Sequence, residues 1–208
     1  MPSGRWTGTE LLVVISAPSG GGKTTVINAL RRKHPEFLYS ISVTTRLRRA
    51  GERSGTHYYF AKPMEFERMR ESGQLLEWAE VHGKSYGTPR SNVERAQSQK
   101  RIMLFDIDVQ GAAALRRSLP EVVSIFLLPP SLRILIQRLR GRHSENREEM
   151  KKRLETAQTE LARAGEYEYL VTNDELGDTV ADCEAIIRAE LLRKERRTAG
   201  GTFAAASR

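Results

Sequence analysis

A continuous apolar run followed at once by a glycine-rich turn is the feature that most limits how this chain can fold. Residues 11–15 are all aliphatic, which is typical of a strand buried on both faces of a sheet. A loop with three consecutive glycines follows at 17–24, and residues 24–32 have the apolar spacing of a helix. A strand, a glycine loop and a helix in this order predict the first unit of a parallel α/β sheet.

The loop fits a phosphate-binding pattern of Gly, four residues, Gly-Lys and then Ser or Thr, with Ala17 in place of the first glycine. Glycines let backbone N–H groups face phosphate oxygens, and the helix N-terminus adds positive potential. Lys23 can reach the β and γ phosphates of ATP, and the Thr24 hydroxyl can hold Mg²⁺. A merely flexible turn is the alternative, but the flanking elements and the Lys-Thr pair favour phosphate binding. The residues expected to contact ATP are Ala17, Pro18, Ser19, Gly20, Gly21, Gly22, Lys23, Thr24 and Thr25.

Later apolar runs repeat the strand pattern at 102–105, 122–128 and 169–173. Helical spacing at 112–119 and 182–193 separates or follows them. The alternation predicts an α/β fold with a doubly wound parallel sheet core of the P-loop NTPase type, whose ligands lie at the carboxyl ends of the strands.

Two segments do not follow this alternation of strands and helices. Residues 40–95 are rich in Thr, Arg, Gly and Tyr and predict an inserted subdomain, while the charged stretch that ends at Arg153 has few apolar anchors and suits a small mobile lid. The predicted division is a core of 10–39, 96–137 and 154–193, a subdomain of 40–95, a lid of 138–153, and flexible termini of 1–9 and 194–208.

Composition excludes several classes of protein. The 208 residues fit one large domain or a core with insertions, and the single cysteine, Cys183, can form neither a disulfide framework nor a Cys-cluster zinc site. The longest apolar run is far shorter than a membrane span, and the flanks of residues 11–15 do not suit a secretion signal, so we expect a cytoplasmic protein. An excess of 34 Lys and Arg over 26 Asp and Glu favours anionic partners, but does not choose between nucleotides and nucleic acid.

The strand at 102–105 runs into two acidic residues, Asp106 and Asp108. Carboxylates at the end of a buried strand can hold water around Mg²⁺, which we expect of Asp106, or accept hydrogen bonds from a second substrate. Ordinary solvated residues at a strand end are the alternative.

Two blocks follow the loop, Ser42-Val43-Thr44-Thr45-Arg46 with Arg49-Ala50-Gly51-Glu52, and then Gly55-Thr56-His57-Tyr58-Tyr59-Phe60. Together they resemble the guanylate kinase signature. The resemblance continues through Glu77-Trp78-Ala79-Glu80, Tyr86-Gly87-Thr88, Asp106-Ile107-Asp108-Val109-Gln110-Gly111, Pro129-Pro130-Ser131, 138–142 and Val171-Thr172-Asn173-Asp174, and covers about residues 10 to 192.

The resemblance implies an enzyme that converts ATP and GMP, with dGMP as a further acceptor, to ADP and GDP with Mg²⁺ as cofactor. It implies that Ser42, Arg46, Arg49, Tyr58 and Tyr86 hold the GMP phosphate, and that Glu77, Thr88 and Asp108 recognise guanine. The chemistry agrees, because one carboxylate can accept from both N1–H and the N2 amino group of guanine, and a hydroxyl can donate to O6. Each residue also has a structural alternative: a solvated basic face for the arginines, and packing for the tyrosines.

The same resemblance implies that Arg138, Arg142 and Arg153 approach the phosphates or adenine when the lid closes, and that they act in transfer together with Lys23 and Arg46. It places Asn173 near the adenine, although a plain turn residue is an alternative. Surface salt bridges with Glu145, Glu148 and Glu149 are the alternative for the lid arginines. In the absence of nucleotide, we expect repulsion among the convergent arginines to hold the cleft open.

Three other functions compete with this interpretation. A non-catalytic module that binds phosphorylated protein segments would lose the phosphate loop, whereas this chain keeps Lys23 and Thr24. A nucleic-acid-dependent ATPase would need a recognition element, and none is evident. Adenylate or thymidylate kinase chemistry is the nearest rival, and Glu77 argues against it. We expect ATP and GMP as partners, no nucleic acid and no membrane, and leave a homo-oligomer open.

Overall fold

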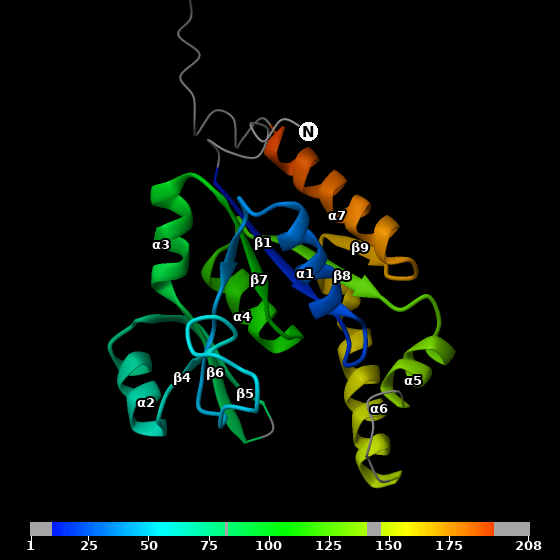
Figure 1. Ribbon diagram of the computed structural model, residues 1–208, viewed down its shortest axis with the longest axis horizontal. Coiled ribbons are helices and arrows are strands. Elements are labelled where there is room, and N and C mark those ends of the chain that lie inside the picture. The colour runs from blue at the N-terminus through cyan, green and yellow to red at the C-terminus, as the bar shows by residue number, and fades with distance from the viewer. Residues whose placement is uncertain (1–9, 82, 141–146, 194–208) are drawn as a thin grey trace, which may run out of the picture.

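The computed structural model describes residues 10–81, 83–140 and 147–193 of the chain (Figure 1). The core is a parallel sheet with the strand order β2-β7-β1-β8-β9. The predicted strands are confirmed, with β1 at the centre, and β2 is an additional edge strand. The strands are β1 (Leu11–Ser16), β2 (Leu38–Ser40), β7 (Ile102–Asp106), β8 (Val123–Leu128) and β9 (Tyr169–Thr172).

Helices cover both faces of this sheet, which explains why β1 is apolar throughout. Leu11, Val13 and Ile15 pack in the cluster that includes α1 (Lys23–Lys33) and α7 (Leu176–Leu191). The alternate side chains, Leu12 and Val14, pack with α3 (Arg90–Gln99) and α4 (Val109–Ser118). Because successive strand residues point to opposite faces, a strand covered on both sides needs apolar residues at every position.

Two helices begin earlier than their apolar spacing predicts. Helix α4 starts at Val109 because Asp108 caps it, its Oδ1 accepting from the backbone N–H of Gly111 at 2.8 Å. Helix α7 starts at Leu176, six residues before the predicted start. The cap means that Asp108 has a structural role in addition to any contact with a ligand.

A second sheet lies within the predicted insertion, with the order β4-β3-β6-β5. Its small core is formed by Val43, Phe66 and Leu75, and α3 returns the chain to the main sheet through Val93. The elements are β3 (Val43–Thr44), β4 (Tyr59–Phe60), α2 (Pro63–Glu71), β5 (Leu75–Val81) and β6 (Lys84–Pro89).

Helices α5 (Leu132–Arg140) and α6 (Arg147–Ala162) lie on the opposite side of the phosphate loop from the second sheet, and a short 3₁₀ helix (η2, Ala164–Glu166) follows (Figure 1). Leu135 and Leu139 of α5 pack on Ala157 of α6. Residues 141–146 of the predicted lid lie outside the described residues. Within the part of the chain that the structure describes, no helix is both long enough and apolar enough to cross a membrane.

Candidate active site

The glycine loop connects the carboxyl end of β1 to α1, as predicted. Gly20 and Gly22 have φ angles of 82° and 85°, a region that side chains with a Cβ rarely adopt. The loop closes tightly, with the N–H of Gly21 donating to the carbonyl of Pro18 at 2.7 Å. Glycine is therefore required here by backbone conformation, which is how such loops direct N–H groups toward phosphate oxygens.

Lys23 reaches the end of β7. Its Nζ lies 2.8 Å from Asp106 Oδ1 and donates to the carbonyl oxygen of Ile107 at 2.8 Å. The hydroxyl of Tyr39 donates to the other oxygen of Asp106 at 3.3 Å. Thus the loop lysine and the strand-end carboxylate, separated by more than eighty positions in sequence, meet as the parallel topology predicts.

Asn173, predicted to lie near the adenine, contacts the phosphate loop directly. It is buried, its Nδ2 donates to the carbonyl of Gly21 at 2.6 Å, and its Oδ1 accepts from the Thr179 hydroxyl at 3.1 Å. Because both polar atoms of the amide are occupied within the protein, the side chain holds the phosphate loop against β9 and α7.

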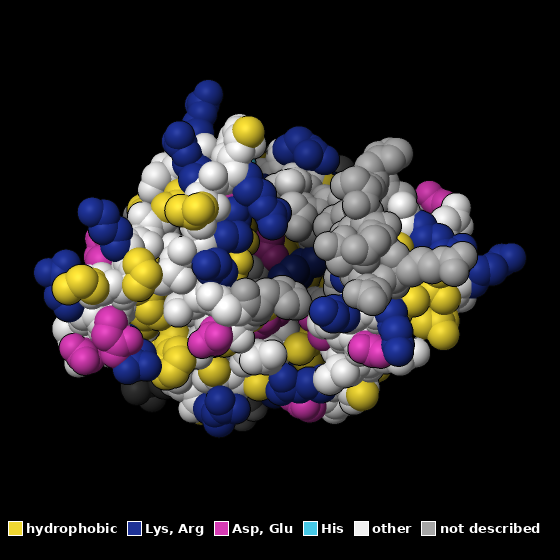
Figure 2. All heavy atoms as spheres, turned by 90° about the horizontal axis from the view of Figure 1, so that it is seen from below, with side chains coloured by type: hydrophobic (Ala, Val, Ile, Leu, Met, Phe, Trp, Pro, Cys, Tyr) yellow, Lys and Arg dark blue, Asp and Glu magenta, His cyan; other side chains and the backbone are white. Residues whose placement is uncertain are grey.

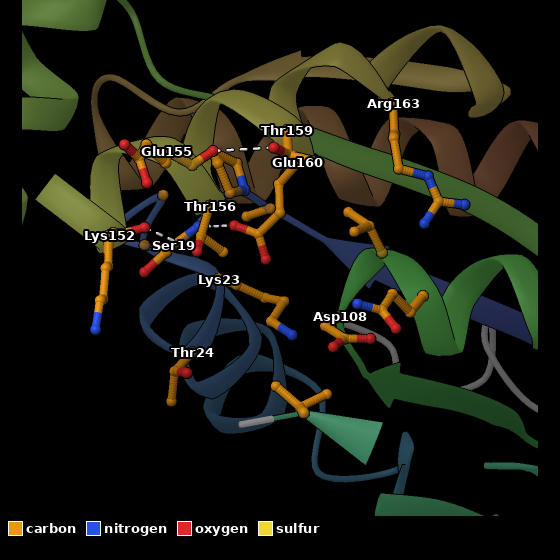
Figure 3. Close-up of a pocket in the computed structure, with 18 of the residues that line it drawn as sticks. Ser19, Lys23, Thr24, Asp108, Lys152, Glu155, Thr156, Thr159, Glu160 and Arg163 are labelled. Atoms are coloured by element: carbon orange, nitrogen blue, oxygen red, sulfur yellow. Dashed lines mark hydrogen bonds between the residues drawn. The ribbon is translucent and has the colours of Figure 1, made fainter. Parts of the chain in front are cut away.

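The phosphate loop forms one wall of a cavity of about 760 Å³, and α6 contributes to the opposite wall (Figure 3). The backbone N–H of Ser19 donates to Glu160 Oε2 at 2.6 Å across this cavity. The α6 wall was not predicted from the sequence, although its polar residues recur at helical spacing. The lining residues on or after α6 are Lys152, Glu155, Thr156, Thr159, Glu160 and Arg163.

The three predicted lid arginines have different positions. Arg138 is half-buried on α5, its Nη1 has no hydrogen-bond partner among the described residues, and the same atom lies 4.0 Å from where a Cβ on Gly22 would stand. Arg153 is on α6 but does not line the cavity. Arg142 lies outside the described residues. Arg138 is therefore the predicted lid arginine that the structure brings to the phosphate loop.

A second cavity, of about 260 Å³, continues from Lys23 and Thr24 toward the second sheet. Figure 2 shows a hollow on the corresponding face, with Lys and Arg side chains gathered around it. Five of the residues predicted to bind GMP line the cavity, and Gly111 is a lining residue that the sequence analysis missed. The five are Ser42, Tyr58, Glu77, Tyr86 and Asp108.

Glu77, which lines this cavity, has a strongly raised pKa. Burial raises the pKa of its carboxyl to about 7; the hydrogen bond from the Thr88 hydroxyl opposes the rise, and the charge of Asp108 adds to it. Thr88 donates to Glu77 Oε1 at 2.5 Å and is fully buried. A hydroxyl has one proton, so Thr88 in this arrangement orients Glu77 and is not free to donate to O6 of guanine.

Of the arginines in the signature block, Arg46 is paired with a carboxylate inside the protein. Arg46 Nη2 lies 2.7 Å from Glu52 Oε1, and the backbone N–H of Arg49 donates to Glu52 at 2.8 Å. The hydrogen bond from Arg46 lowers the pKa of Glu52 to about 2. The pairing with Glu52 reduces what Arg46 can contribute to the expected repulsion among the convergent arginines, and the opening of the cleft stays a prediction. The side chain of Arg49 is exposed and does not line the cavity.

Thr24 and Asp106 offer oxygen donors at the junction of the two predicted substrates, and both line the smaller cavity. No cluster of three or more His, Cys, Asp or Glu residues suitable for a metal occurs among the described residues. Two oxygen donors are what a Mg²⁺ site needs when phosphate oxygens and water supply the other ligands, so the residues fit this ion.

Comparison with known proteins identifies the family. The guanylate kinase family model matches residues 9–190. The chain is 49% identical over 188 residues to the guanylate kinase of Chelativorans sp. (strain BNC1), covering 90% of this chain and 86% of that protein. It is 43% identical to the guanylate kinase of Carboxydothermus hydrogenoformans, over 89% of this chain and 91% of that protein. The crystal structure of guanylate kinase from Anaplasma phagocytophilum superposes with a TM-score of 0.75 at 33% identity, covering 92% of each chain.

Proposed function

The chain belongs to the guanylate kinase family, and on that premise we propose that it transfers the γ-phosphoryl group of ATP to GMP, giving ADP and GDP. The observation that carries the proposal is the continuity of the smaller cavity. Lys23 and Thr24 of the phosphate loop line it together with Glu77 and Asp108 of the predicted guanine site. One cavity can therefore hold the acceptor with its phosphate directed at the loop.

Guanine recognition is assigned to Glu77, with Thr88 as a positioning residue. As a carboxylate, Glu77 accepts from N1–H and from the N2 amino group at once, which adenine cannot match because it has no donor at N1. The Thr88 hydroxyl holds Oε1 in place. Asp108 lines the same end of the cavity as a second acceptor. A site built on buried acceptors rejects a base that leaves them unpaired.

The acceptor phosphate is assigned to Ser42, Tyr58, Tyr86 and Arg46. The first three line the cavity, and the guanidinium carbon of Arg46 lies 5.4 Å from the centre of the Tyr58 ring. A dianionic phosphate has to compete with Glu52 for Arg46, because the carboxylate already pairs with it. Arg49 is also assigned to this phosphate, but its side chain is exposed and outside the cavity, so contact with GMP requires movement of the loop that carries it.

Lys23 and Arg138 are assigned to the phosphates of ATP. Lys23 already points from α1 to the strand end, and Arg138 brings an unpartnered guanidinium nitrogen close to Gly22. Both are positive charges directed at the place where negative charge develops during transfer, and such preorganised charge is the main catalytic contribution in phosphoryl transfer. Arg142 and Arg153 belong to the same proposal as residues of a lid at 138–153.

Mg²⁺ is the proposed cofactor, held by the Thr24 hydroxyl and, through water, by Asp106. When bound, the ion would offset the negative charge of the nucleotide phosphates. We further propose that residues 40–95 form the GMP-binding subdomain and that the protein works in the cytoplasm on ATP and GMP, with no nucleic-acid or membrane partner.

A coupled assay of ADP release tests the proposal, with ATP held constant and GMP, dGMP, AMP, CMP, UMP and dTMP compared. GMP should be the fastest acceptor, with dGMP next. Glu77→Gln should weaken GMP selectively, by roughly tenfold or more, whereas Glu71→Gln, an exposed residue of the same subdomain, is the matched control. A preference for AMP or dTMP in the parent enzyme would reject the assignment.

A further inference from the structure

A third cavity, of about 560 Å³, lies between α1, β2, α3 and the loop that precedes β4. None of its lining residues lines either cavity of the active site. Its most conspicuous members are four arginines, and no Asp or Glu occurs among the lining residues that the structure describes. The arginines are Arg31, Arg32, Arg95 and Arg101.

One aromatic ring separates this cavity from the active site. The ring of Tyr39 has the guanidinium carbon of Arg31 4.2 Å from its centre, while the Tyr39 hydroxyl donates to Asp106. The two sites thus lie on opposite ends of a single side chain. The cavity also contains Gly55 and Thr56, so that its wall includes part of the predicted GMP-binding subdomain.

Uncharged groups orient three of these arginines, Arg31, Arg95 and Arg101. Arg95 Nη2 donates to the carbonyl of Tyr39 at 3.0 Å, and Arg101 Nε donates to the carbonyl of Glu36 at 2.6 Å. The carboxylate of Glu36 itself contacts His34 at 3.1 Å. Carbonyls and an aromatic face orient the guanidinium groups but leave their net charge in place.

Arg95 keeps one donor that the described part of the protein leaves unpaired. Its Nε is buried and has no hydrogen-bond partner among the described residues. Buried donors without an acceptor are uncommon in folded proteins. Arg31 and Arg32 also stand in the last turn of α1, where basic residues offset the helix dipole. The dipole accounts for neither Arg95 nor Arg101, which come from other parts of the chain.

We propose that this cavity binds a small polyphosphorylated anion at a site separate from the active site. Four positive charges match two or three phosphate groups, since each phosphate monoester carries about −1.5 to −2 charge near neutral pH. The volume exceeds that of one phosphate and lies in the range of small-ligand pockets. Guanidinium groups bind phosphate oxygens in pairs, which favours a ligand with several of them.

The aromatic residues of the cavity indicate that phosphates, and not a base, are recognised. Arg31 covers the Tyr39 ring, and Phe37 is buried and stacks on His34 with 4.6 Å between ring centres. One face of the Tyr39 ring is thus occupied and the Phe37 ring is buried, which disfavours stacking of a nucleobase. Inorganic tripolyphosphate should bind as well as a nucleoside triphosphate, and the identity of the base should have no effect.

Isothermal titration with inorganic tripolyphosphate tests the site. The protein is first saturated with a bisubstrate analogue that joins adenosine and guanosine through five phosphates, so that the phosphate loop is occupied. One further equivalent of tripolyphosphate should then bind. Replacing tripolyphosphate with ATP or GTP distinguishes an inorganic from a nucleotide source: equal affinity supports phosphate recognition, whereas a requirement for one base overturns it.

Two variants on different elements localise the binding. Arg31→Ala/Arg32→Ala should weaken tripolyphosphate binding at least tenfold, and Thr56→Glu should weaken it by adding a negative charge from the opposite wall. The matched control is Arg117→Ala, an exposed arginine in the last turn of α4 that lines none of the three cavities. Circular dichroism confirms folding of each variant. Binding that vanishes once the bisubstrate analogue is present, or that both cavity variants leave at the parental affinity, overturns the proposal.

Discussion

The backbone N–H of Ser19 donates to Glu160 Oε2 at 2.6 Å, so that a carboxylate from α6 contacts the loop assigned to the ATP phosphates (Figure 3). The loop presents N–H donors that suit an anion, and here a protein carboxylate meets one of them. A phosphate oxygen that is to accept from Ser19 must displace Glu160. The Glu160 carboxylate therefore competes with an ATP phosphate for the N–H group of Ser19.

The first prediction is that Glu160→Gln tightens ATP binding about fivefold, equivalent to roughly 1 kcal/mol. The amide keeps the shape of the side chain but removes the charge that opposes the triphosphate. Equilibrium titration with a non-hydrolysable ATP analogue measures the effect. Glu155→Gln removes a charge from the same cavity, and among the described residues Glu155 makes no hydrogen bond to the loop, so this variant separates the specific contact from general electrostatics. Equal effects of the two variants would show that the contact with Ser19 does not matter.

The second prediction concerns pH and GMP. Burial raises the pKa of Glu77 to about 7, so below that pH the free enzyme holds the carboxyl mostly protonated. Guanine recognition needs the carboxylate, and affinity should fall up to tenfold for each pH unit below about 7. Calorimetry in buffers of different ionisation enthalpy should detect proton release when GMP binds at pH 6. The GMP phosphate also titrates near pH 6, and Glu77→Gln is the control that isolates the Glu77 contribution.

The same pKa shift predicts that Glu77, although it favours GMP binding, lowers the stability of the folded protein as the pH rises. The pKa of Glu77 is higher in the folded state than its ordinary value of 4.5, so the folded state binds more protons between about pH 4.5 and 7. Stability is therefore lost as the pH rises through that window. Glu77→Gln should be more stable than the parent at pH 8, on the order of 1–3 kcal/mol, while binding GMP more weakly. Thermal unfolding at pH 5 and pH 8 measures this difference. If the variant is no more stable than the parent at pH 8, burial of Glu77 does not raise its pKa as stated.

Much of the site could be predicted because its geometry follows from local patterns and one topological rule. The loop at 17–24 and the acids after residue 105 each stand at the carboxyl end of a buried strand. Parallel neighbours bring those ends to one edge, and the pair of Lys23 with Asp106 results. No detail of side-chain packing is needed for that step.

The missed features depend on packing between distant segments. Glu160 meets Ser19 across 141 residues, and its approach depends on how α5 and α6 pack beside the loop. The orientation of Thr88 follows from the antiparallel register of β5 and β6, which places it directly opposite Glu77. Resemblance to a family identified both residues of that pair as readers of guanine, but only the register shows that one of them holds the other.

The fourth prediction tests whether Asn173 holds the loop or reads adenine. Asn173→Ala removes the donor to Gly21 and leaves the Thr179 hydroxyl without that acceptor. A residue that holds the loop should affect ATP and GTP as phosphate donors to the same extent, with a loss of about 1–3 kcal/mol in unfolding free energy. A residue that reads adenine should change the ratio of the two donors. Steady-state kinetics with each donor, together with urea unfolding, distinguish the outcomes.

The last prediction concerns the close approach of Asn173 to Gly22. Gly22 has a φ of +85°, and a Cβ added there would lie 2.5 Å from Asn173 Nδ2. Gly22→Ala therefore suffers both an unfavourable backbone conformation, worth roughly 1–2 kcal/mol, and a steric conflict. Gly177→Ala is the control, because a Cβ in that position meets nothing within 4 Å and should be neutral or stabilising by up to about 1 kcal/mol. Adding Asn173→Ala to Gly22→Ala should remove the steric part only. The double variant is thus expected to be less destabilised than the sum of the two single variants in urea unfolding. Strict additivity would mean that the two positions do not interact.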